Sequence, residues 1–259
     1  MINFVKKLLK SNIFLIVLAE KFLTDLKINF EKEYKIVSYI DKPIILDVGG
    51  HKGESVANFR KFNPKSLVYS FEPNLNLYKK IKKNFFFDKK IKIYNFAISN
   101  KKINNLYIPY ALNKPLTLWA SFNKKYLIQR WKKHTNIEIS KIKIKKIKVV
   151  SKKLDQFKIK SNLLKIDTEG SEHEVIKSGL KQIKKYKPLI ILEFNSNNFD
   201  EIKKTLYKLN YKVYNYDHSN NKLLSLNKKE IKNIYNDTNS KNLIFYNIKS
   251  KILKKTDIN

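Results

Sequence analysis

The stretch that decides the fold is Ile45–Ser55, ILDVGGHKGES. An apolar run carries Asp47 near its end, two adjacent glycines follow, and Gly53 comes just before a helical pattern. Glycines let a backbone turn tightly beside a ligand, and the helix that follows presents its positive N-terminus to it. The order of strand, glycine turn and helix therefore predicts a nucleotide-binding unit of an α/β fold.

The scarcity of glycine makes this stretch more informative. The chain has 5 glycines among its 259 residues, whereas average usage would give about 18. All of them lie in two short segments, residues 49–53 and 170–179. We infer that glycine is kept where a Cβ atom would not fit.

Composition limits the classes of site and of compartment. A chain of this length forms one good-sized domain with a core. It has no cysteine, which excludes disulfides, thiolate metal sites and cysteine nucleophiles and fits a reducing compartment. We therefore predict a cytoplasmic location, with a membrane-peripheral one as the alternative.

The net charge of +33 would suit a nucleic-acid partner, but its make-up favours another explanation. Arginine, whose planar fork binds phosphates and bases, occurs only at Arg60 and Arg130. Lysines are spread along the whole chain, which is typical of a compositional bias on solvated faces. We expect no nucleic-acid partner. A weak attraction to anionic membranes or acidic glycans remains an alternative.

Residues 1–36 are predicted to form an N-terminal helical extension. The apolar run Ile13–Ala19 is too short to span a bilayer, which takes about 20 residues. Glu20 and Lys21 stand where a signal peptide would have small residues. We expect this helix to pack on the domain or on a partner, and a peripheral membrane contact is the alternative.

Residues 37–259 are predicted to form one Rossmann-like domain, because short β-branched runs alternate with helical patterns. The expected fold is α/β, with a mostly parallel seven-stranded sheet and helices on both faces. The expected strands are residues 43–48, 66–72, 92–98, 162–167, 188–194, 211–216 and 242–248.

An insertion at about residues 99–160 interrupts this alternation before the fourth core strand. It contains Trp119 and Trp131 and an alternating run, Ile142–Val150, that we interpret as an edge strand with its lysines outward. Long insertions at the carboxyl ends of sheet strands often cover a substrate. Trp119 is a candidate for stacking on a sugar, with a place in the core as the alternative.

Two carboxylates point to the ligand of the first glycine turn. Asp47 would repel a pyrophosphate, and the adjacent glycines differ from the dinucleotide pattern, which disfavours a nicotinamide dehydrogenase. An acid suits the ammonium group of S-adenosylmethionine, which has no phosphate. Glu72, at the end of the second strand, can accept hydrogen bonds from both ribose hydroxyls. The predicted cofactor is therefore S-adenosylmethionine.

A second cluster of acids follows the fourth core strand in Leu163–Gly179, LLKIDTEGSEHEVIKSG. Asp167 ends the strand, and Glu193 ends the next one. Either can orient a hydroxyl or act as a base, and our order of candidates for the base is Asp167, Glu193 and His173. Together they could also hold a divalent metal, but two oxygen ligands do not make a metal site, and we predict none.

Glu169 and Glu172 have a simpler alternative. Both precede or begin the next helix, where acids stabilise the positive end of the helix dipole. His173 has the alternative of an ordinary surface residue on that helix.

Taken in order, these motifs resemble the FkbM-type methyltransferases. The matching pieces are DVGGHKGES, FEPN, NFAIS, LDQF, LLKIDTEGSEHEVIKSG and PLIILEF, from about Ile44 to Phe194. The resemblance implies the class I S-adenosylmethionine-dependent fold and methylation of hydroxyls of sugars, glycans or natural products. It places Asp47, Gly49, Gly53, Glu72 and Ala97 in the cofactor pocket, and we add their motif neighbours Gly50, His51, Pro73 and Asn74.

The same resemblance puts Asp167, Glu169 and Glu172 in the signature block of the family. One departure is Gly50–His51, where the family pattern has Ala–Asn. We therefore predict an S-adenosylmethionine-dependent O-methyltransferase that acts on a sugar, a surface polysaccharide or a related metabolite.

Two alternatives to this function remain. One is an RNA ribose 2′-O-methyltransferase. Methylation of base amines and of pyrimidine carbons is excluded, because the chain lacks the Pro-Pro-Tyr-type motif of the first and the cysteine of the second. The other is a non-catalytic protein of the same fold that binds a glycan or a partner.

Overall fold

The computed structural model describes residues 11–25, 31–194, 198–217, 219–227, 229–231, 233 and 242–253. Within them the main sheet has eight strands in the order β11-β10-β12-β9-β8-β1-β2-β3. The bounds are β1 Ile44–Val48, β2 Leu67–Phe71, β3 Ile91–Tyr94, β8 Leu163–Ile166, β9 Leu189–Glu193, β10 Tyr211–Asp217, β11 Lys222–Ser225 and β12 Asn242–Asn247.

The sheet is mostly parallel, as predicted. The neighbours from β3 to β9 pair in parallel, and β12, β10 and β11 join them antiparallel. The prediction of seven strands is wrong by one. The additional strand, β11, has four residues and only Leu223 is buried, so it lacks the apolar run that marks a strand in the sequence.

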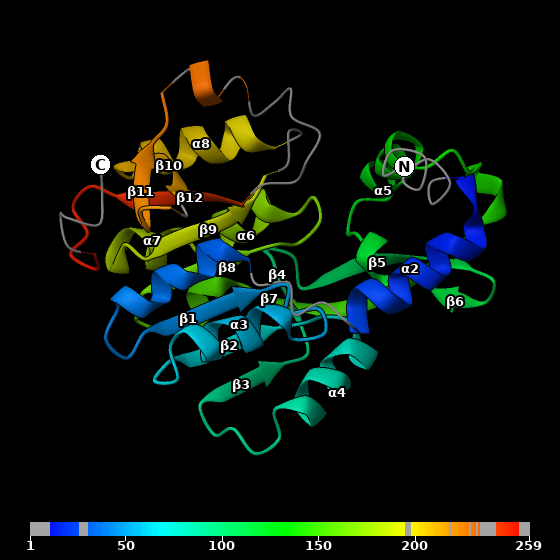
Figure 1. Ribbon diagram of the computed structural model, residues 1–259, viewed down its shortest axis with the longest axis horizontal. Helices are drawn as coiled ribbons and strands as arrows, with labels where there is room; N and C mark the ends of the chain where they lie inside the picture. Colours follow the sequence, from blue (N-terminus) through cyan, green and yellow to red (C-terminus); the bar gives the residue numbers. More distant parts are fainter. Residues whose placement is uncertain are drawn as a thin grey trace.

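Helices cover both faces of the sheet (Figure 1). The 3-10 helix η1 (Lys32–Tyr39) and α3 (Glu54–Phe62) pack on one face with Ile45 and Val68. On the other, α6 (Glu172–Ser178), α7 (Leu180–Tyr186) and α8 (Phe199–Tyr207) pack with Leu46 and Ile166. Successive strand residues thus enter opposite cores, which is why β8 is buried along its whole length and apolar except for Lys165.

The segment placed between the third and fourth core strands forms a second, four-stranded sheet in the order β4-β7-β5-β6. Its elements are β4 Ala97–Ile98, β5 Ile103–Ala111, β6 Lys114–Pro115, η2 Thr117–Trp119, α5 Lys124–His134, η3 Ile139–Lys141, β7 Lys143–Lys152 and η4 Leu154–Gln156. Figure 1 shows this smaller lobe beside the main sheet.

One prediction about this region is wrong. The segment 92–98 is not one strand, because β3 pairs in the main sheet and β4 in the small one. The run Ile142–Val150 is an edge strand, as predicted: within the described residues β5 pairs along one side of it, and β4 reaches only Ser151 and Lys152. Its lysines face solvent, which produces the alternating pattern.

The N-terminal helix packs on the small lobe. Helix α2 (Ile13–Asp25) buries Ile16 against Leu116 and Trp131, while residues 1–10 and 26–30 of the predicted extension lie outside the described residues. The rest of that extension, from Glu31, leads into η1, whose Tyr34, Ile36 and Val37 belong to the core of the main sheet.

Among the described residues, no helix has both the length and the apolar character that crossing a membrane requires.

Candidate active site

A cavity of about 470 Å³ opens where the carboxyl ends of β1, β2, β8 and β9 meet the small lobe. This volume lies within the range of small-molecule sites, about 300–1,000 Å³. Most of the predicted cofactor and catalytic residues line it: Gly49, Gly50, His51, Glu72, Pro73, Asn74, Ala97, Asp167, Glu169 and Glu193. The fold thus gathers residues from both sequence motifs at one place.

The glycine turn after β1 is tightly enclosed. Gly49 and Gly50 both donate their N–H to the carbonyl of Phe71, at 3.0 and 3.2 Å. Gly49 has φ +89°, and a Cβ atom there would lie 1.7 Å from the carbonyl oxygen of Asp167. Only glycine fits between the ends of these strands.

Asp47 and Gly53 do not line the cavity, which corrects two of the predicted cofactor contacts. Asp47 is fully buried and accepts hydrogen bonds from Ser55 Oγ at 2.9 Å and Ser70 Oγ at 2.6 Å. Gly53 caps α3 with φ +96° and lies against the ring of Phe85. Both support the turn from beneath, so Asp47 cannot meet a ligand ammonium directly.

Glu72 is a buried carboxylate at the cavity wall. Its Oε2 accepts from the N–H of His51 and its Oε1 from the N–H of Asn74, each at 2.8 Å. Burial raises the pKa of Glu72 to about 7, although these backbone donors lower it. Each oxygen keeps a second lone pair, so the carboxylate can also accept from two ligand hydroxyls.

His51, the departure from the family pattern, joins the glycine turn to the small lobe. Its Nε2 lies 3.0 Å from Thr117 Oγ1 and its Nδ1 lies 3.2 Å from Glu54 Oε1. Thr117 donates its own proton to Glu20 on α2 at 2.9 Å. Sequence analysis missed Thr117, since the contact spans 66 residues and leaves no local pattern.

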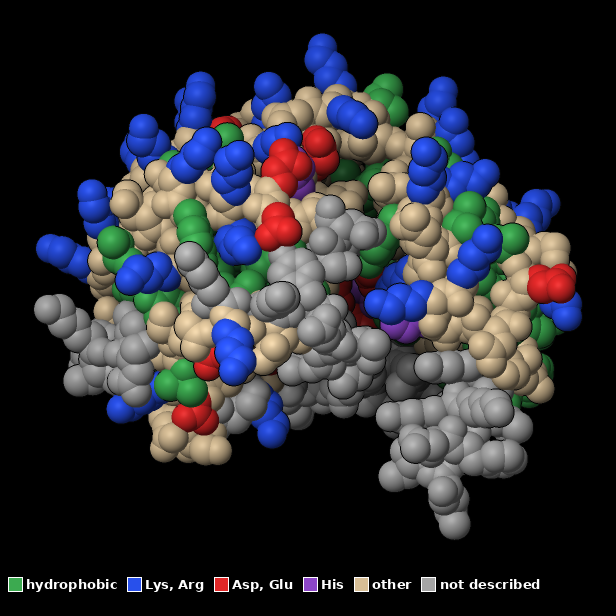
Figure 2. All heavy atoms as spheres, turned by 90° about the horizontal axis from the view of Figure 1, so that it is seen from above, with side chains coloured by type: hydrophobic (Ala, Val, Ile, Leu, Met, Phe, Trp, Pro, Cys, Tyr) green, Lys and Arg blue, Asp and Glu red, His purple; other side chains and the backbone are tan. Residues whose placement is uncertain are grey.

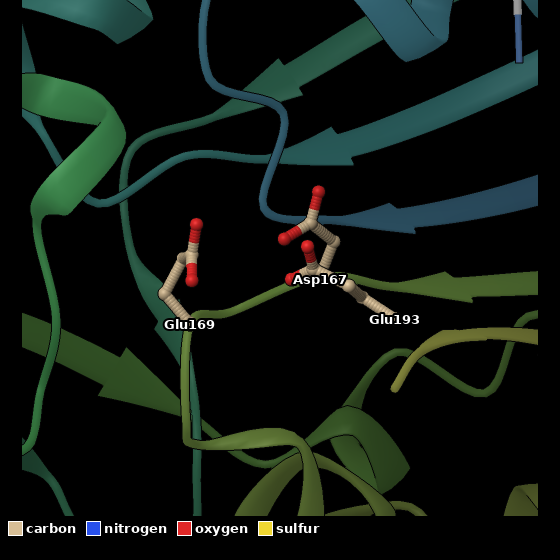
Figure 3. A group of neighbouring side chains, drawn as sticks. All are labelled: Asp167, Glu169 and Glu193. Atoms are coloured by element: carbon tan, nitrogen blue, oxygen red, sulfur yellow. The ribbon is translucent and has the colours of Figure 1, made fainter. Parts of the chain in front are cut away.

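Asp167, Glu169 and Glu193 bring carboxylate oxygens within 4.8 Å of one another (Figure 3). Burial raises the pKa of Glu193 well above its usual value, and repulsion from Asp167 raises it further. Burial would also raise the pKa of Asp167, but Lys165 and the hydrogen bond with Glu193 outweigh it and hold that pKa low. Of the two, Asp167 is therefore the stronger acid and Glu193 the weaker one.

Lys165, which sequence analysis did not single out, controls this charge. Its Nζ donates to the carbonyl of Gly49 at 2.8 Å and lies 3.3 Å from Asp167 Oδ2 and 3.5 Å from Asp47 Oδ1. Its neighbouring acids raise its pKa against the effect of burial. The signal was available: a lysine in the middle of the buried strand LLKI needs a charged partner.

Arg130 of α5 is the third missed residue. Its Nη1 lies 2.8 Å from Glu169 Oε2. Burial still raises the pKa of Glu169 to about 8, because Arg130 only partly offsets it. The three clustered carboxylates are oxygen donors suited to a divalent cation, yet Lys165 and Arg130 already neutralise two of them. We assign no metal.

Three further predicted residues lie outside the cavity lining. Glu172 is buried and accepts from the N–H groups of Thr168 and Gly170, so it clamps the turn after β8. His173 faces α8, with its Nε2 2.8 Å from Glu201 Oε1, which removes it as a base candidate. Trp119 packs against Trp131 with ring centroids 5.0 Å apart and lies under the Arg130 guanidinium.

The sequence profile of the FkbM methyltransferase domain matches residues 47–213. This chain belongs to the FkbM methyltransferase family. The order of its main sheet, with β12 antiparallel between β9 and β10, is that of the class I S-adenosylmethionine-dependent methyltransferase fold. The cofactor of this family is S-adenosylmethionine, and the cavity residues suit it. The carboxylate of Glu72 is available to accept from ribose hydroxyls, and the adjacent turn at Gly49 and Gly50 has no side chains to obstruct a ligand.

Solved structures resemble the chain only in broad outline. The FkbM methyltransferase of Methylobacillus flagellatus has 13% identity and a TM-score of 0.48, over 79% of this chain and 43% of that one. A precorrin-6y C5,15-methyltransferase of Geobacter metallireducens has 10% identity and a TM-score of 0.42, over 83% of each chain. An S-adenosylmethionine-dependent O-methyltransferase of Thermotoga maritima has 10% identity and a TM-score of 0.41, over 84% of this chain and 64% of that one.

The chain thus spans less than half the length of the Methylobacillus protein. A search of curated proteins found no match. The assignment to the family rests on the sequence profile, and the roles of single residues rest on the geometry of the cavity.

Proposed function

We propose that this protein transfers the methyl group of S-adenosylmethionine to a hydroxyl of a sugar, a surface glycan or a related metabolite. The observation that carries this proposal is the position of Asp167 on the wall of the cavity that Glu72 also lines, with Lys165 Nζ 3.3 Å from its Oδ2. A cytoplasmic location, which fits a chain without cysteine, belongs to the same proposal.

In this proposal one group of residues binds the cofactor and another accepts the proton. Bound S-adenosylmethionine supplies an electrophilic methyl group on its sulfonium. Glu72 accepts the ribose hydroxyls, and the turn Gly49–His51 shapes the cavity beside them. Asp167 accepts the proton of the acceptor hydroxyl, which becomes acidic as the new C–O bond forms, so a carboxylate of low pKa suffices. The proton on Glu193 and the charge on Lys165 keep Asp167 in that state.

The charge of the cavity opposes the RNA alternative. Seven acidic side chains line it: Glu31, Glu33, Glu54, Glu72, Asp167, Glu169 and Glu193. Burial raises the pKa of Glu72, Glu169 and Glu193, so the negative charge at the reacting end is that of Asp167, whose pKa is held low. Lys165, the lining residue with an ammonium group, is already paired with Asp47 and Asp167. Lys and Arg side chains lie spread over the face in Figure 2 rather than gathered into one track. A phosphodiester backbone would meet repulsion at the reacting end.

The proposal is tested with a labelled methyl donor offered to host glycans, nucleotide-sugar precursors and RNA in parallel. We expect label in a hydroxyl of a glycan or sugar. Asp167→Asn should lower kcat by about 10²- to 10⁴-fold and leave the affinity for the cofactor within about twofold, since Asp167 acts on the acceptor. The matched control is Asp200→Asn, which changes an acid on α8 away from the cavity and should leave kcat unchanged.

Turnover of Asp167→Asn at the wild-type rate would exclude Asp167 as the proton acceptor. Label in RNA would favour the ribose methyltransferase, and cofactor binding without transfer to any acceptor would favour the non-catalytic alternative.

A further inference from the structure

The loop between α4 (Leu75–Asn84) and β3 presents two phenylalanines to solvent. Phe86 is 71% exposed and Phe87 is 91% exposed, and their rings meet edge-on at 5.1 Å. Their neighbour Phe85 turns the other way and packs against Gly53 and the core of the main sheet. Phe85 therefore anchors the loop, while the next two rings project from it as a small apolar tip.

The segment around this tip has more than twice the fraction of lysine found in the rest of the chain. Seven of the fourteen residues from 79 to 92 are lysine, against 55 Lys and Arg in 259 residues overall. All seven are exposed: Lys79, Lys80, Lys82, Lys83, Lys89, Lys90 and Lys92. The one acid of this segment, Asp88, is paired with Arg60 at 2.7 Å. The local charge thus exceeds what the compositional bias of the chain explains.

The tip lies away from the cavity. Asn74 and Leu77, at the start of α4, line the cavity, whereas Phe86 and Phe87 follow the other end of the helix. Figure 1 shows this end of α4 and the loop to β3 at the lower edge of the molecule, remote from the small lobe. A contact made there would leave the cavity open.

We propose that Phe86 and Phe87 insert into the surface of an anionic membrane while the surrounding lysines bind its lipid phosphates. Exposed aromatic rings gain by entering the boundary between headgroups and acyl chains, and basic residues near it add electrostatic attraction to anionic lipid. A protein partner fits less well, because lysine is depleted in protein interfaces. The proposed surface is not on α2, for which a membrane contact was the alternative to packing on the domain, and whose Ile16 is buried against the small lobe.

The test is co-sedimentation of the full chain with vesicles of phosphatidylcholine, with and without phosphatidylglycerol, at low and high salt. We expect binding to the vesicles that contain phosphatidylglycerol, weakened by salt. Phe86→Ser/Phe87→Ser should lower the affinity by about tenfold or more, and Lys82→Glu/Lys83→Glu should have an effect of similar size. Melting temperature and cofactor affinity should stay at the wild-type values in both variants.

Two matched controls separate this tip from other surfaces. Phe14→Ser removes an exposed ring on α2, and Lys132→Glu/Lys133→Glu reverses two exposed charges on α5. Both should bind vesicles like the wild type.

An equal loss of binding in these controls would overturn the proposal in favour of diffuse charge. It would also fall if the wild type did not bind anionic vesicles, or if Phe86→Ser/Phe87→Ser abolished self-association in light scattering instead of vesicle binding. None of these results depends on the methyl acceptor, so the proposed function stands or falls separately.

Discussion

Lys165 connects the two halves of the site through one ammonium group. It contacts the carbonyl of Gly49 in the cofactor turn and the carboxylate of Asp167 in the acid cluster. Buried with Asp47, it is also paired within the core. Replacing Lys165 alone, or one of its acidic partners alone, destabilises the fold, because a buried charge is then left without its partner. It is a positioning residue whose effect is exerted through Asp167.

We expect Lys165→Met to move the acid limb of the kcat–pH profile to higher pH. Asp167 is a base only when ionised, so activity falls as the pH drops through its pKa. Lys165 holds that pKa low, and burial alone would raise it. Without the ammonium, burial dominates and ionisation requires a higher pH. A profile measured on folded protein, alongside the surface variant Lys148→Met, checks this.

An acid limb that stays in place in Lys165→Met would show that the lysine only supports the fold. The single variant leaves Asp47 buried without its charged partner, which should lower the free energy of unfolding by about 3–5 kcal/mol. The double variant Asp47→Asn/Lys165→Met removes both charges and is therefore measured as well. It should show the same displaced limb.

The proposed contact of Glu72 with the ribose should make the affinity for the cofactor depend on pH. Burial raises its pKa to about 7, and ribose hydroxyls donate to the ionised form. Protonation therefore competes with binding, and below pH 7 the Kd for S-adenosylmethionine should rise by up to about tenfold per pH unit. Titration calorimetry between about pH 5.5 and 8.5 measures this. Glu72→Gln should lose the dependence, and a wild-type Kd that is constant over the range would contradict the role of Glu72.

At the scale of elements, helix α2 is tied to the site through η2. Glu20 accepts from Thr117 Oγ1 and from the N–H of Leu118, both at 2.9 Å. Thr117 in turn meets His51 in the cofactor turn. A polar chain from Glu20 through Thr117 to His51 thus joins α2 and the small lobe to the glycine turn at the cavity wall, in addition to the apolar contacts of Ile16.

Glu20→Ala should loosen η2 and not just α2. Loss of the two hydrogen bonds should cost about 1–3 kcal/mol and speed hydrogen exchange at the amide of Leu118. The control is Asn12→Ala, which removes the side chain that accepts from the N–H of Phe14 at the start of α2 but does not touch η2. Equal acceleration at Leu118 in both variants would mean that the helix as a whole, and not Glu20, holds η2.

At the scale of the whole molecule, local patterns predicted the parallel sheet and its glycine turn. Helix α3 begins at Glu54, directly after Gly53, where the sequence predicts a helix, because the glycine and a clear apolar periodicity mark its start. Strand β11 was missed because only one of its four residues, Leu223, is buried, which gives no such signal. The split of segment 92–98 depends on pairing with β7, which is distant in sequence and enters no local pattern.

The sequence predicts those residues of the candidate site that lie at the ends of strands. Residues such as Glu72 and Asp167 follow apolar strands, and parallel strands end at one edge. Thr117 and Arg130 reach the site from the small lobe, whose position the sequence does not specify. Lys165 was hidden by the abundance of lysine, and the burial of Asp47 beneath the turn follows from the packing of Ser55 and Ser70 around it.

The central claim is that the cavity binds S-adenosylmethionine through Glu72. Titration calorimetry of the wild type and of Glu72→Ala with S-adenosylmethionine and its demethylated product tests it most directly. We predict micromolar binding of both ligands to the wild type and a loss of at least about tenfold in Glu72→Ala. No binding to the wild type, with stabilisation by NAD instead, or equal binding to both proteins would contradict the account.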